Sequence, residues 1–314
     1  MVMRYFILAG FFLLSLTTVC FAQKPEPKQK VRTVTIPISI FTKKELKQKQ
    51  IEEYVQADRL IVREDKEEQE ILSIRSVDSA ALSMAIVIQE DLASTFNLQI
   101  KDIKDFIQGL PKGTRVMVAY ARSGAIDVRQ RFTDNLELAA NSLRIVSGNS
   151  SLAPRSPYDS VSEVVNRFEG VPAGRRAILL FSDGLDTSQG VNLASITQSF
   201  DLDRAILKAQ RKGVAVYSFY SPSSGTENGS SIFSLASQGA LEKISEETGG
   251  RAFSNGSIAP ISYLPFFKNL VMSLNRQFSL TYLSTHMKKG YHKVEVTSTN
   301  PEIEIEHPKG YYFR

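Results

Sequence analysis

Apolar residues follow three different patterns along the chain, and each pattern predicts a different kind of structure. Between residues 80 and 277, short continuous apolar runs end at Ile88, Phe181 and Phe219. Continuous runs are typical of strands that are buried on both faces of a parallel sheet. Between these runs, apolar residues recur three and four positions apart, which is typical of helices. The alternation predicts a doubly wound, mostly parallel α/β sheet flanked by helices.

Local signals predict where these helices begin and end. A helical face over residues 96–110 closes near Gly109 and Pro111, and Thr133 is expected to cap a helix that reaches Val146. Ser156 and Pro157 form a typical helix start, with Ser at the cap and Pro at the first helical position. Further helices are expected over residues 202–211, 235–248 and 261–277.

The stretches on either side of this central domain are rich in short strands. Before it, alternating or β-branched residues predict strands at 34–40, 60–62 and 71–74; after it, similar runs lie at 278–283, 291–297, 303–306 and 311–313. Neither stretch has enough strands to bury an apolar face alone. We therefore expect segments 33–79 and 278–314 to pack together as one small β module beside a central domain of residues 80–277.

The first 32 residues read as an export signal followed by a linker. One positive charge, Arg4, precedes an apolar run that is shorter than a membrane-spanning helix, and Cys20 and Ala22 suit a cleavage site after Ala22. Residues 23–32 are rich in Pro and Lys, as in a solvated linker. We expect an exported protein, periplasmic or secreted, with no membrane span after cleavage; a retained anchor and a lipid on Cys20 are the alternatives.

Composition and charge exclude several classes of function. The formal net charge is +5 and is spread along the chain, which does not favour a nucleic-acid partner. The sequence has three His, all in the last 30 residues, and one Cys. Most zinc, Ser-His-Asp and Cys-His mechanisms are therefore unlikely. His286 and His292 flank an expected hairpin, where they are either a metal pair or ordinary cross-strand residues.

The candidate site lies where two buried strands are expected to end. Ligands of open doubly wound sheets collect outside the carboxyl ends of the strands. The loop after Ile88 contains Gln89, Glu90 and Asp91, and the loop after Phe181 contains Asp183 and Asp186. Two neighbouring carboxylates suit a hard cation or a shared proton. As ordinary structure, Asp183 with Gly184 is a turn and Asp91 is a helix cap.

These residues resemble a known family. Ala177 to Asp186 (AILLFSDGLD) is similar to the fourth strand and metal-site loop of von Willebrand factor type A domains, and Met84 to Ser94 lies where those domains carry a loop of the form Asp-x-Ser-x-Ser. Segments 241–253, 278–283 and 307–313 resemble the bacterial secreted branch called the VWFA-related acidobacterial-type family. The resemblance covers about residues 31–314. It implies an adhesion module, not an enzyme, with a Mg²⁺ site that recognises a partner's carboxylate.

The chain departs from the family at the metal ligands. The alignment puts Gln89, Asp91 and Ala93 at the Asp, Ser and Ser positions, and Asp183 alone matches in kind. The family's Thr position falls at Arg155, where a positive charge opposes a cation, and Ser156 is the nearest hydroxyl. Asp91 and Asp183 therefore form either an altered Mg²⁺ site or, as we expect, a vestigial one.

Two classes of function follow from these observations. The first is an exported, non-enzymatic binding module that recognises a protein or cell-envelope partner at this edge of the sheet; its expected binding residues are Gln89, Glu90, Ala93, Arg155, Ser156 and Asp186. The alternative is a metal-assisted hydrolase that uses the carboxylates of Asp91 and Asp183. The hydrolase lacks a nucleophile and base at suitable spacing.

Overall fold

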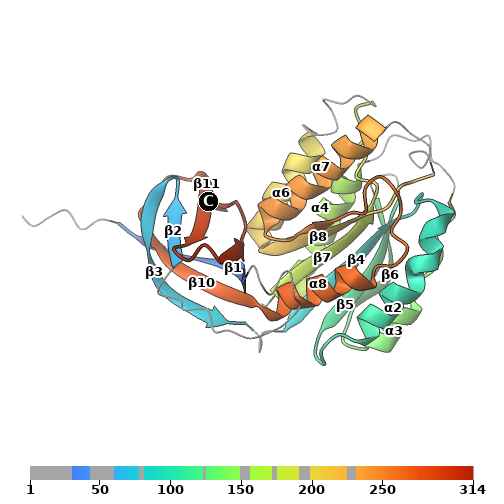
Figure 1. Ribbon diagram of the computed structural model, residues 1–314, viewed down its shortest axis with the longest axis horizontal. Coiled ribbons are helices and arrows are strands. Elements are labelled where there is room, and N and C mark those ends of the chain that lie inside the picture. The colour runs from blue at the N-terminus through green and yellow to red at the C-terminus, as the bar shows by residue number, and fades with distance from the viewer. Residues whose placement is uncertain are drawn as a thin grey trace, which may run out of the picture. The chain divides into compact units, whose positions relative to one another are not determined.

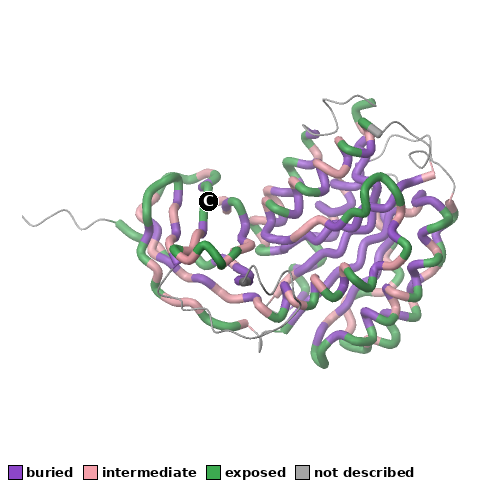
Figure 2. The backbone as a smooth tube through the Cα atoms, in the orientation of Figure 1, coloured by how far each residue is buried: buried purple, intermediate pink, exposed green. Residues whose placement is uncertain are grey.

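The central sheet follows from the continuous apolar runs. In a computed structural model, β4 (Leu82–Gln89), β7 (Arg175–Ser182) and β8 (Val214–Tyr220) lie side by side and are parallel. All residues of β4 and β8 are buried, because helices cover both faces of the sheet. Figure 2 shows these strands as the most continuously buried part of the chain.

The structure describes residues 30–42, 60–77, 81–122, 125–148, 156–171, 175–190, 199–224 and 231–313. The expected signal segment and Arg155 lie outside these residues. Val31–Arg314 form one compact unit. The domain boundaries expected within this unit, near residues 80 and 278, stay predictions.

Among the described residues, the central sheet has six strands in the order β6-β5-β4-β7-β8-β9. The other members are β5 (Arg115–Arg122), β6 (Ala125–Thr133) and the short β9 (Ala252–Phe253). Four of the five neighbouring pairs are parallel, and β5 with β6 is antiparallel. In chain order the arrangement is 3-2-1-4-5-6, which is a doubly wound order.

Helices pack on both faces of this sheet (Figure 1). One apolar cluster joins the sheet to α2 (Ile100–Gln108), α3 (Leu136–Asn141) and α8 (Leu264–Asn275). The other joins it to α4 (Pro157–Arg167), α6 (Phe200–Lys212) and α7 (Ser231–Thr248). Two 3₁₀ helices, η2 (Ser94–Gln99) and η3 (Phe168–Gly170), adjoin α2 and α4.

Two expected helix boundaries are wrong. The helix that was expected to reach Val146 ends at Asn141, although Val146 is buried in the same cluster. Asn135, rather than Thr133, caps this helix, because the Asn135 side chain accepts the hydrogen bond from the Leu138 N–H at 2.9 Å. Apolar spacing predicted the burial correctly but not the backbone conformation.

The second sheet is antiparallel, so the expectation of a mostly parallel sheet does not hold for the chain as a whole. Its seven strands in the described residues run in the order β12-β1-β10-β3-β2-β11-β13. Residues before the central sheet supply β1 (Arg32–Thr42), β2 (Leu60–Glu64) and β3 (Glu67–Ser76). Residues after it supply β10 (Gln277–Ser284), β11 (Gly290–Ser298), β12 (Ile303–Glu306) and β13 (Gly310–Phe313).

The two ends of the described chain are interleaved in this sheet. β1 lies between β10 and β12, and the pair β3–β2 lies between β10 and β11, so strands of the first stretch are inserted between strands of the second. Their inward residues form a third apolar cluster that includes Ile36, Val62, Leu280 and Val294. This sheet therefore owes its core to both stretches.

Candidate functional site at the carboxyl edge of the central sheet

The loops after β4 and β7 lie side by side at the carboxyl edge of the sheet. β4 continues to α2 on one face, whereas β7 continues to α6 on the opposite face. The boundary between these two strands is therefore the switch point at which ligands collect in doubly wound sheets. Beneath it, Phe181 of β7 stacks on Phe219 of β8 with ring centroids 4.7 Å apart, which gives the loops a rigid base.

A buried glutamine joins the two loops. The Gln89 side chain is 2% exposed. Its Nε2 donates to Asp91 Oδ1 at 2.9 Å, and its Oε1 accepts from Ser182 Oγ at 2.5 Å and from the Asp183 N–H at 3.2 Å. The amide thus donates to one carboxylate and accepts from the neighbouring strand, so both of its ends are satisfied.

Asp183 forms the turn after β7. Its Oδ1 accepts from the Leu185 N–H at 3.0 Å, which closes an Asx turn, and Gly184 has φ = +71°. The Tyr158 hydroxyl, at the start of α4, donates to the Gly184 carbonyl at 2.9 Å. Burial, with the charges of Asp186 and Asp183, holds the pKa of the Tyr158 phenol well above its usual range. The neutral phenol therefore remains a donor that ties α4 to this turn.

Asp186 is 3% exposed and is held by hydroxyl groups. Ser156 Oγ donates to Asp186 Oδ2 at 3.1 Å, Ser199 Oγ donates to the same oxygen, and Ser188 Oγ donates to Oδ1 at 2.6 Å. Ser156 was expected to cap α4, yet its side chain makes no cap hydrogen bond and contacts Asp186 instead. Asp186 therefore links the loop after β7 to the starts of α4 and α6.

These residues do not fit the family's Mg²⁺ site. Mg²⁺ prefers six oxygen ligands in octahedral geometry. At the first ligand position Gln89 aims an N–H at Asp91, and at the third position Ala93 offers a methyl group in place of a hydroxyl. Asp183 Oδ1 and both oxygens of Asp186 accept hydrogen bonds from the chain. These side chains therefore form a closed hydrogen-bond network rather than a set of metal ligands.

Glu90 lies apart from this network, on the side of β5 and β6. Its Oε1 pairs with Arg144 Nη2 at 2.8 Å, and its Oε2 lies 3.7 Å from Arg122 Nε. The Arg144 guanidinium also lies over the Tyr120 ring, 4.2 Å from its centroid, and 3.6 Å from Asp127 Oδ2. Glu90 is therefore placed for charge pairing rather than for a joint site with Asp183.

Sequence reasoning missed several of these partners. Ser182, Ser188 and Ser199 support the carboxylates, but serines in loops carry no distinctive signal. Arg144 is likewise one cation among many in the sequence. A usable signal for Gln89 did exist, because a glutamine at a family carboxylate position predicts an exchange of charge for hydrogen bonding.

None of the helices in the described part of the chain combines the length and apolarity needed to cross a membrane. No family model matches the sequence, and no curated protein matches it either.

Solved structures with a similar fold include three bacterial proteins. An aerotolerance-related membrane protein from Bacteroides fragilis is 12% identical with a TM-score of 0.41, and the likeness covers 62% of this chain and 99% of that one. BatB from Bacteroides thetaiotaomicron is 13% identical with a TM-score of 0.42, over 62% and 97%. A von Willebrand factor type A protein from Catenulispora acidiphila is 10% identical with a TM-score of 0.43, over 84% and 65%.

Sequence identities of 10–13% give no information about what this chain binds. The motifs that carry the family resemblance follow β4 and β7, and the structure places both at the switch point of a 3-2-1-4-5-6 sheet with an antiparallel edge strand, β6. This arrangement agrees with the doubly wound fold that the resemblance of the sequence motifs to von Willebrand factor type A domains predicts.

Proposed function

We propose that this protein is an exported, non-enzymatic binding module that recognises a protein or cell-envelope partner at the carboxyl edge of the central sheet without a metal ion. The observation that carries the proposal is the Gln89 amide, which joins Asp91, Ser182 and Asp183 by hydrogen bonds. In this network no cation is needed to hold the two loops together. The narrower assignment to the secreted VWFA-related branch is part of the same proposal.

Exposed apolar side chains on segments at this edge support a binding surface. Asn97 exchanges two hydrogen bonds with Val146, at 2.8 and 3.1 Å, so the segment around Val146 lies beside η2. Leu98 and Ile145, next to these residues, are 77% and 68% exposed. Phe200 opens α6 and is 74% exposed. Several large exposed apolar side chains at one edge are typical of a protein-binding site.

The chemistry of the edge favours binding over catalysis. The buried carboxylates accept hydrogen bonds from the chain's own hydroxyl and N–H groups. An activated nucleophile needs a neighbouring base within hydrogen-bond reach, and the described site offers hydroxyl groups that donate to carboxylates already engaged in several such bonds. The partner would contact the exposed rim of the edge.

Capture of a partner from an extract of the producing cells tests this proposal. We expect the same partner with Mg²⁺ and with chelator, and at least tenfold weaker capture by Leu98→Ser or Phe200→Ser. The matched control is Val271→Ser. Val271 is 39% exposed and lines a groove with Leu82 and Arg175, the first residues of β4 and β7, so it lies away from the carboxyl edge. Capture lost on chelation, or lost equally in the control variant, would contradict the proposal.

Two further measurements check its other parts. We expect no shift in the melting temperature of the purified protein on adding Mg²⁺ or chelator; a chelator-sensitive melting temperature that becomes insensitive in Asp183→Ala would restore the metal-dependent mechanism. Mass spectrometry of the protein from its host should show a chain that begins at Gln23. A chain that retains Met1 would contradict export by cleavage.

A further inference from the structure

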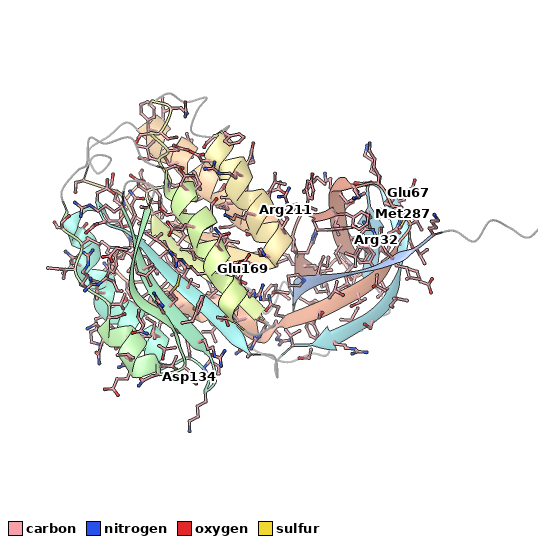
Figure 3. All side chains as sticks on the ribbon, turned by 180° about the vertical axis from the view of Figure 1, so that it is seen from behind. Arg32, Glu67, Asp134, Glu169, Arg211 and Met287 are labelled. Carbon is pink, nitrogen blue, oxygen red and sulfur yellow. The ribbon has the colours of Figure 1, made fainter. Side chains whose placement is uncertain are left out.

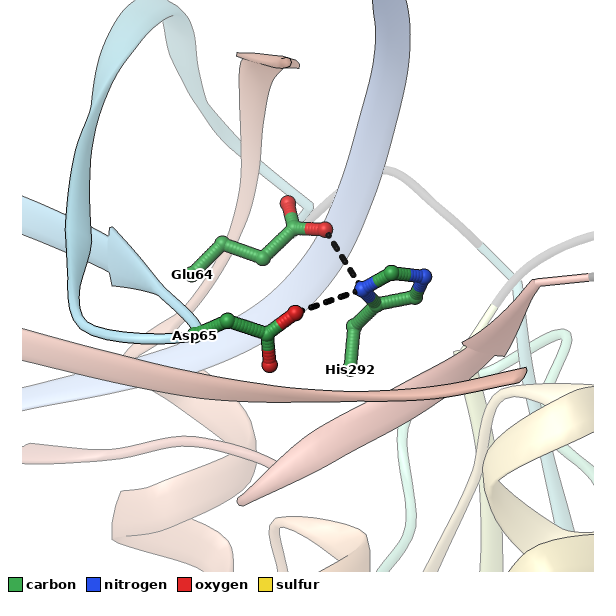
Figure 4. A group of neighbouring side chains, drawn as sticks. All are labelled: Glu64, Asp65 and His292. Atoms are coloured by element: carbon green, nitrogen blue, oxygen red, sulfur yellow. Dashed lines mark hydrogen bonds and ion pairs between the residues drawn. The ribbon is translucent and has the colours of Figure 1, made fainter. Parts of the chain in front are cut away.

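A second cluster of ionisable side chains lies in the antiparallel sheet, away from the carboxyl edge of the central sheet. Glu64 ends β2, and Asp65 begins the turn to β3. His292 lies on the neighbouring strand β11, and His286 lies between β10 and β11. Figure 4 shows the two carboxylates directed at Nδ1 of His292. Arg32, Glu67 and Met287 are labelled near this end of the sheet in Figure 3.

The donor atoms are spaced like the ligands of one small ion. His292 Nδ1 lies 2.8 Å from Asp65 Oδ2 and 3.3 Å from Glu64 Oε1, and His286 Nδ1 lies 3.8 Å from the same Glu64 oxygen. Ligands held tetrahedrally at the usual Zn–N and Zn–O distances lie about 3.3 Å from one another. The separation of His292 from Glu64 matches that value, and its separation from Asp65 is shorter. The ligand atoms of Glu64, Asp65 and His292 all lie within 4.8 Å of one another, and His286 lies outside this group.

The surrounding contacts fix the orientation of these ligands. His292 Nε2 lies 2.7 Å from the Lys288 carbonyl, which can only accept, so Nε2 carries a proton. A histidine that ligates a metal typically donates its other N–H in this way. Asp65 Oδ1 accepts from the Lys293 N–H at 2.9 Å, and Glu64 Oε1 accepts from Tyr311 Oη at 2.6 Å and Ser284 Oγ at 3.0 Å.

Two buried polar atoms of the cluster lack a hydrogen-bond partner among the described residues. They are Oε2 of Glu64, a residue that is 0% exposed, and Nδ1 of His286. A buried carboxylate oxygen or imidazole nitrogen without a partner is costly. Both atoms have lone pairs that a cation can use.

The local charge leaves room for a positive ion. Arg32 Nη2 lies 3.3 Å from Glu64 Oε1, and its guanidinium stacks over Phe313, 3.9 Å from the ring centroid. Arg32 therefore balances one of the two carboxylates, and a bound cation would balance the other.

We propose that Glu64, Asp65 and His292 form the core of a structural site for a divalent transition-metal ion of the Zn²⁺ class, which His286 beside them would complete as a fourth ligand. Two imidazoles and two carboxylates suit Zn²⁺ and Co²⁺ better than Mg²⁺ or Ca²⁺, which prefer oxygen ligands alone. Four protein ligands are typical of structural zinc sites. Glu64 and His292 are buried, whereas Asp65 lies at the exposed side of the group. The ion would fasten the β2–β3 turn to the β10–β11 connection, which joins the two ends of the described chain.

Titration of the metal-free full chain with Co²⁺ and Zn²⁺ tests the site. We expect one Co²⁺ per chain, with the intense visible absorption of tetrahedral coordination, displaced by Zn²⁺. Asp65→Asn and His286→Gln should weaken Zn²⁺ binding by roughly tenfold or more. Glu68→Gln is the matched control, because Glu68 is an exposed carboxylate on β3 and the variant loses the same charge without losing a ligand.

Each outcome decides the question. If wild-type protein binds no Co²⁺ or Zn²⁺ at about 100 µM free ion, or if Co²⁺ gives only the weak absorption of octahedral coordination, the proposal is wrong. If Glu68→Gln weakened Zn²⁺ binding equally, the loss of negative charge and not the loss of a ligand would explain the effect, and the proposed site would also be wrong. The wild-type spectrum decides even if Asp65→Asn or His286→Gln fails to fold.

Discussion

At the scale of single residues, Gln89 determines how the loops after β4 and β7 are linked at the carboxyl edge of the central sheet. A carboxylate at this position would face Asp91 across 2.9 Å, and two such charges repel strongly unless a cation lies between them. The neutral amide replaces that repulsion with a donated hydrogen bond, and its oxygen reaches the next strand. The hydrogen bonds of this one side chain therefore link the two loops without adding a charge.

Removing this amide should be costly. Gln89→Ala takes the partner from Asp91 Oδ1, Ser182 Oγ and the Asp183 N–H, all of which are buried. Because an unsatisfied buried polar group costs about 1–3 kcal/mol, we expect the free energy of unfolding to fall by roughly 2 kcal/mol or more. Chemical denaturation of the wild-type protein and the variant measures this change in the free energy of unfolding.

The control for this prediction is Gln99→Ala. Gln99 is 5% exposed, and within the described residues its side chain donates one hydrogen bond, at 2.9 Å, to the Pro260 carbonyl. Its loss should therefore cost less than the loss of Gln89. An equal or larger cost for Gln99→Ala would mean that the Gln89 network adds little to stability.

Residues of the candidate site differ in how well the sequence predicted them. Asp183 and Gly184 form the turn that their residue types favour. The ends of β4 and β7 could be predicted from the apolar runs, and with them the neighbouring positions of Asp91 and Asp183 in the loops that follow. The contacts of Ser199 with Asp186 and of Arg144 with Glu90 join segments 13 and 54 residues apart in sequence. No local pattern encodes such pairings.

At the scale of elements, the loop after β7 is held tightly against α7. Gly184 has φ = +71°, and a Cβ at this position would lie 2.6 Å from the Ser237 carbonyl and 2.8 Å from Leu241 Cγ. The carbonyl belongs to the helix backbone, so it cannot move without shifting α7. The close approach of loop and helix therefore depends on the missing side chain.

Gly184→Ala should destabilise the protein more than Gly213→Ala. Gly213 ends α6 with φ = +61°, and a Cβ there would meet nothing within 4 Å, so both variants share the left-handed backbone strain but Gly184→Ala alone adds the clash. Overpacking of this kind costs about 1–3 kcal/mol, and denaturant unfolding of the two variants should differ by that amount. Equal losses would show that the loop can move away from α7.

Elements with strong apolar patterns were predictable, whereas their ends were less so. Strands β4, β7 and β8 contain the predicted apolar runs with a few more residues at the ends. The helix expected to reach Val146 stops at Asn141 because buried positions do not require helical backbone: Leu143 and Val146 reach the core from an irregular segment. That segment is held partly by Asn97, whose side chain pairs with the Val146 backbone.

At the scale of the whole molecule, the antiparallel sheet shows what sequence alone leaves open. The lack of a sufficient core in either stretch predicted that the two pack together. The interleaved strand order was not predictable, because pairing partners such as Ile36 and Leu280 lie more than 240 positions apart. Glu64 and His292 are likewise 228 positions apart in the sequence, so the cluster they form became visible through the fold.

The strand order also predicts what happens when the last stretch is removed. Deleting residues 278–314 removes both neighbours of β1, one neighbour of β3 and one of β2. What remains is β1 alone and the β2–β3 hairpin, whose described pairing spans Val62–Glu64 and Glu67–Gln69. A lone hairpin is marginally stable in water, and buried residues such as Val62 would become exposed.

We therefore expect limited proteolysis of the truncated protein to cut within residues 31–77 while a fragment that contains the central sheet persists. The fragment should survive because the two apolar clusters on the faces of that sheet contain no residue of the deleted stretch. The full-length protein, treated in parallel, should resist cleavage over the same residues. Protection of residues 31–77 in the truncated protein would mean that the first stretch folds without strands β10 and β11, and that the shared core around Leu280 is not what holds it.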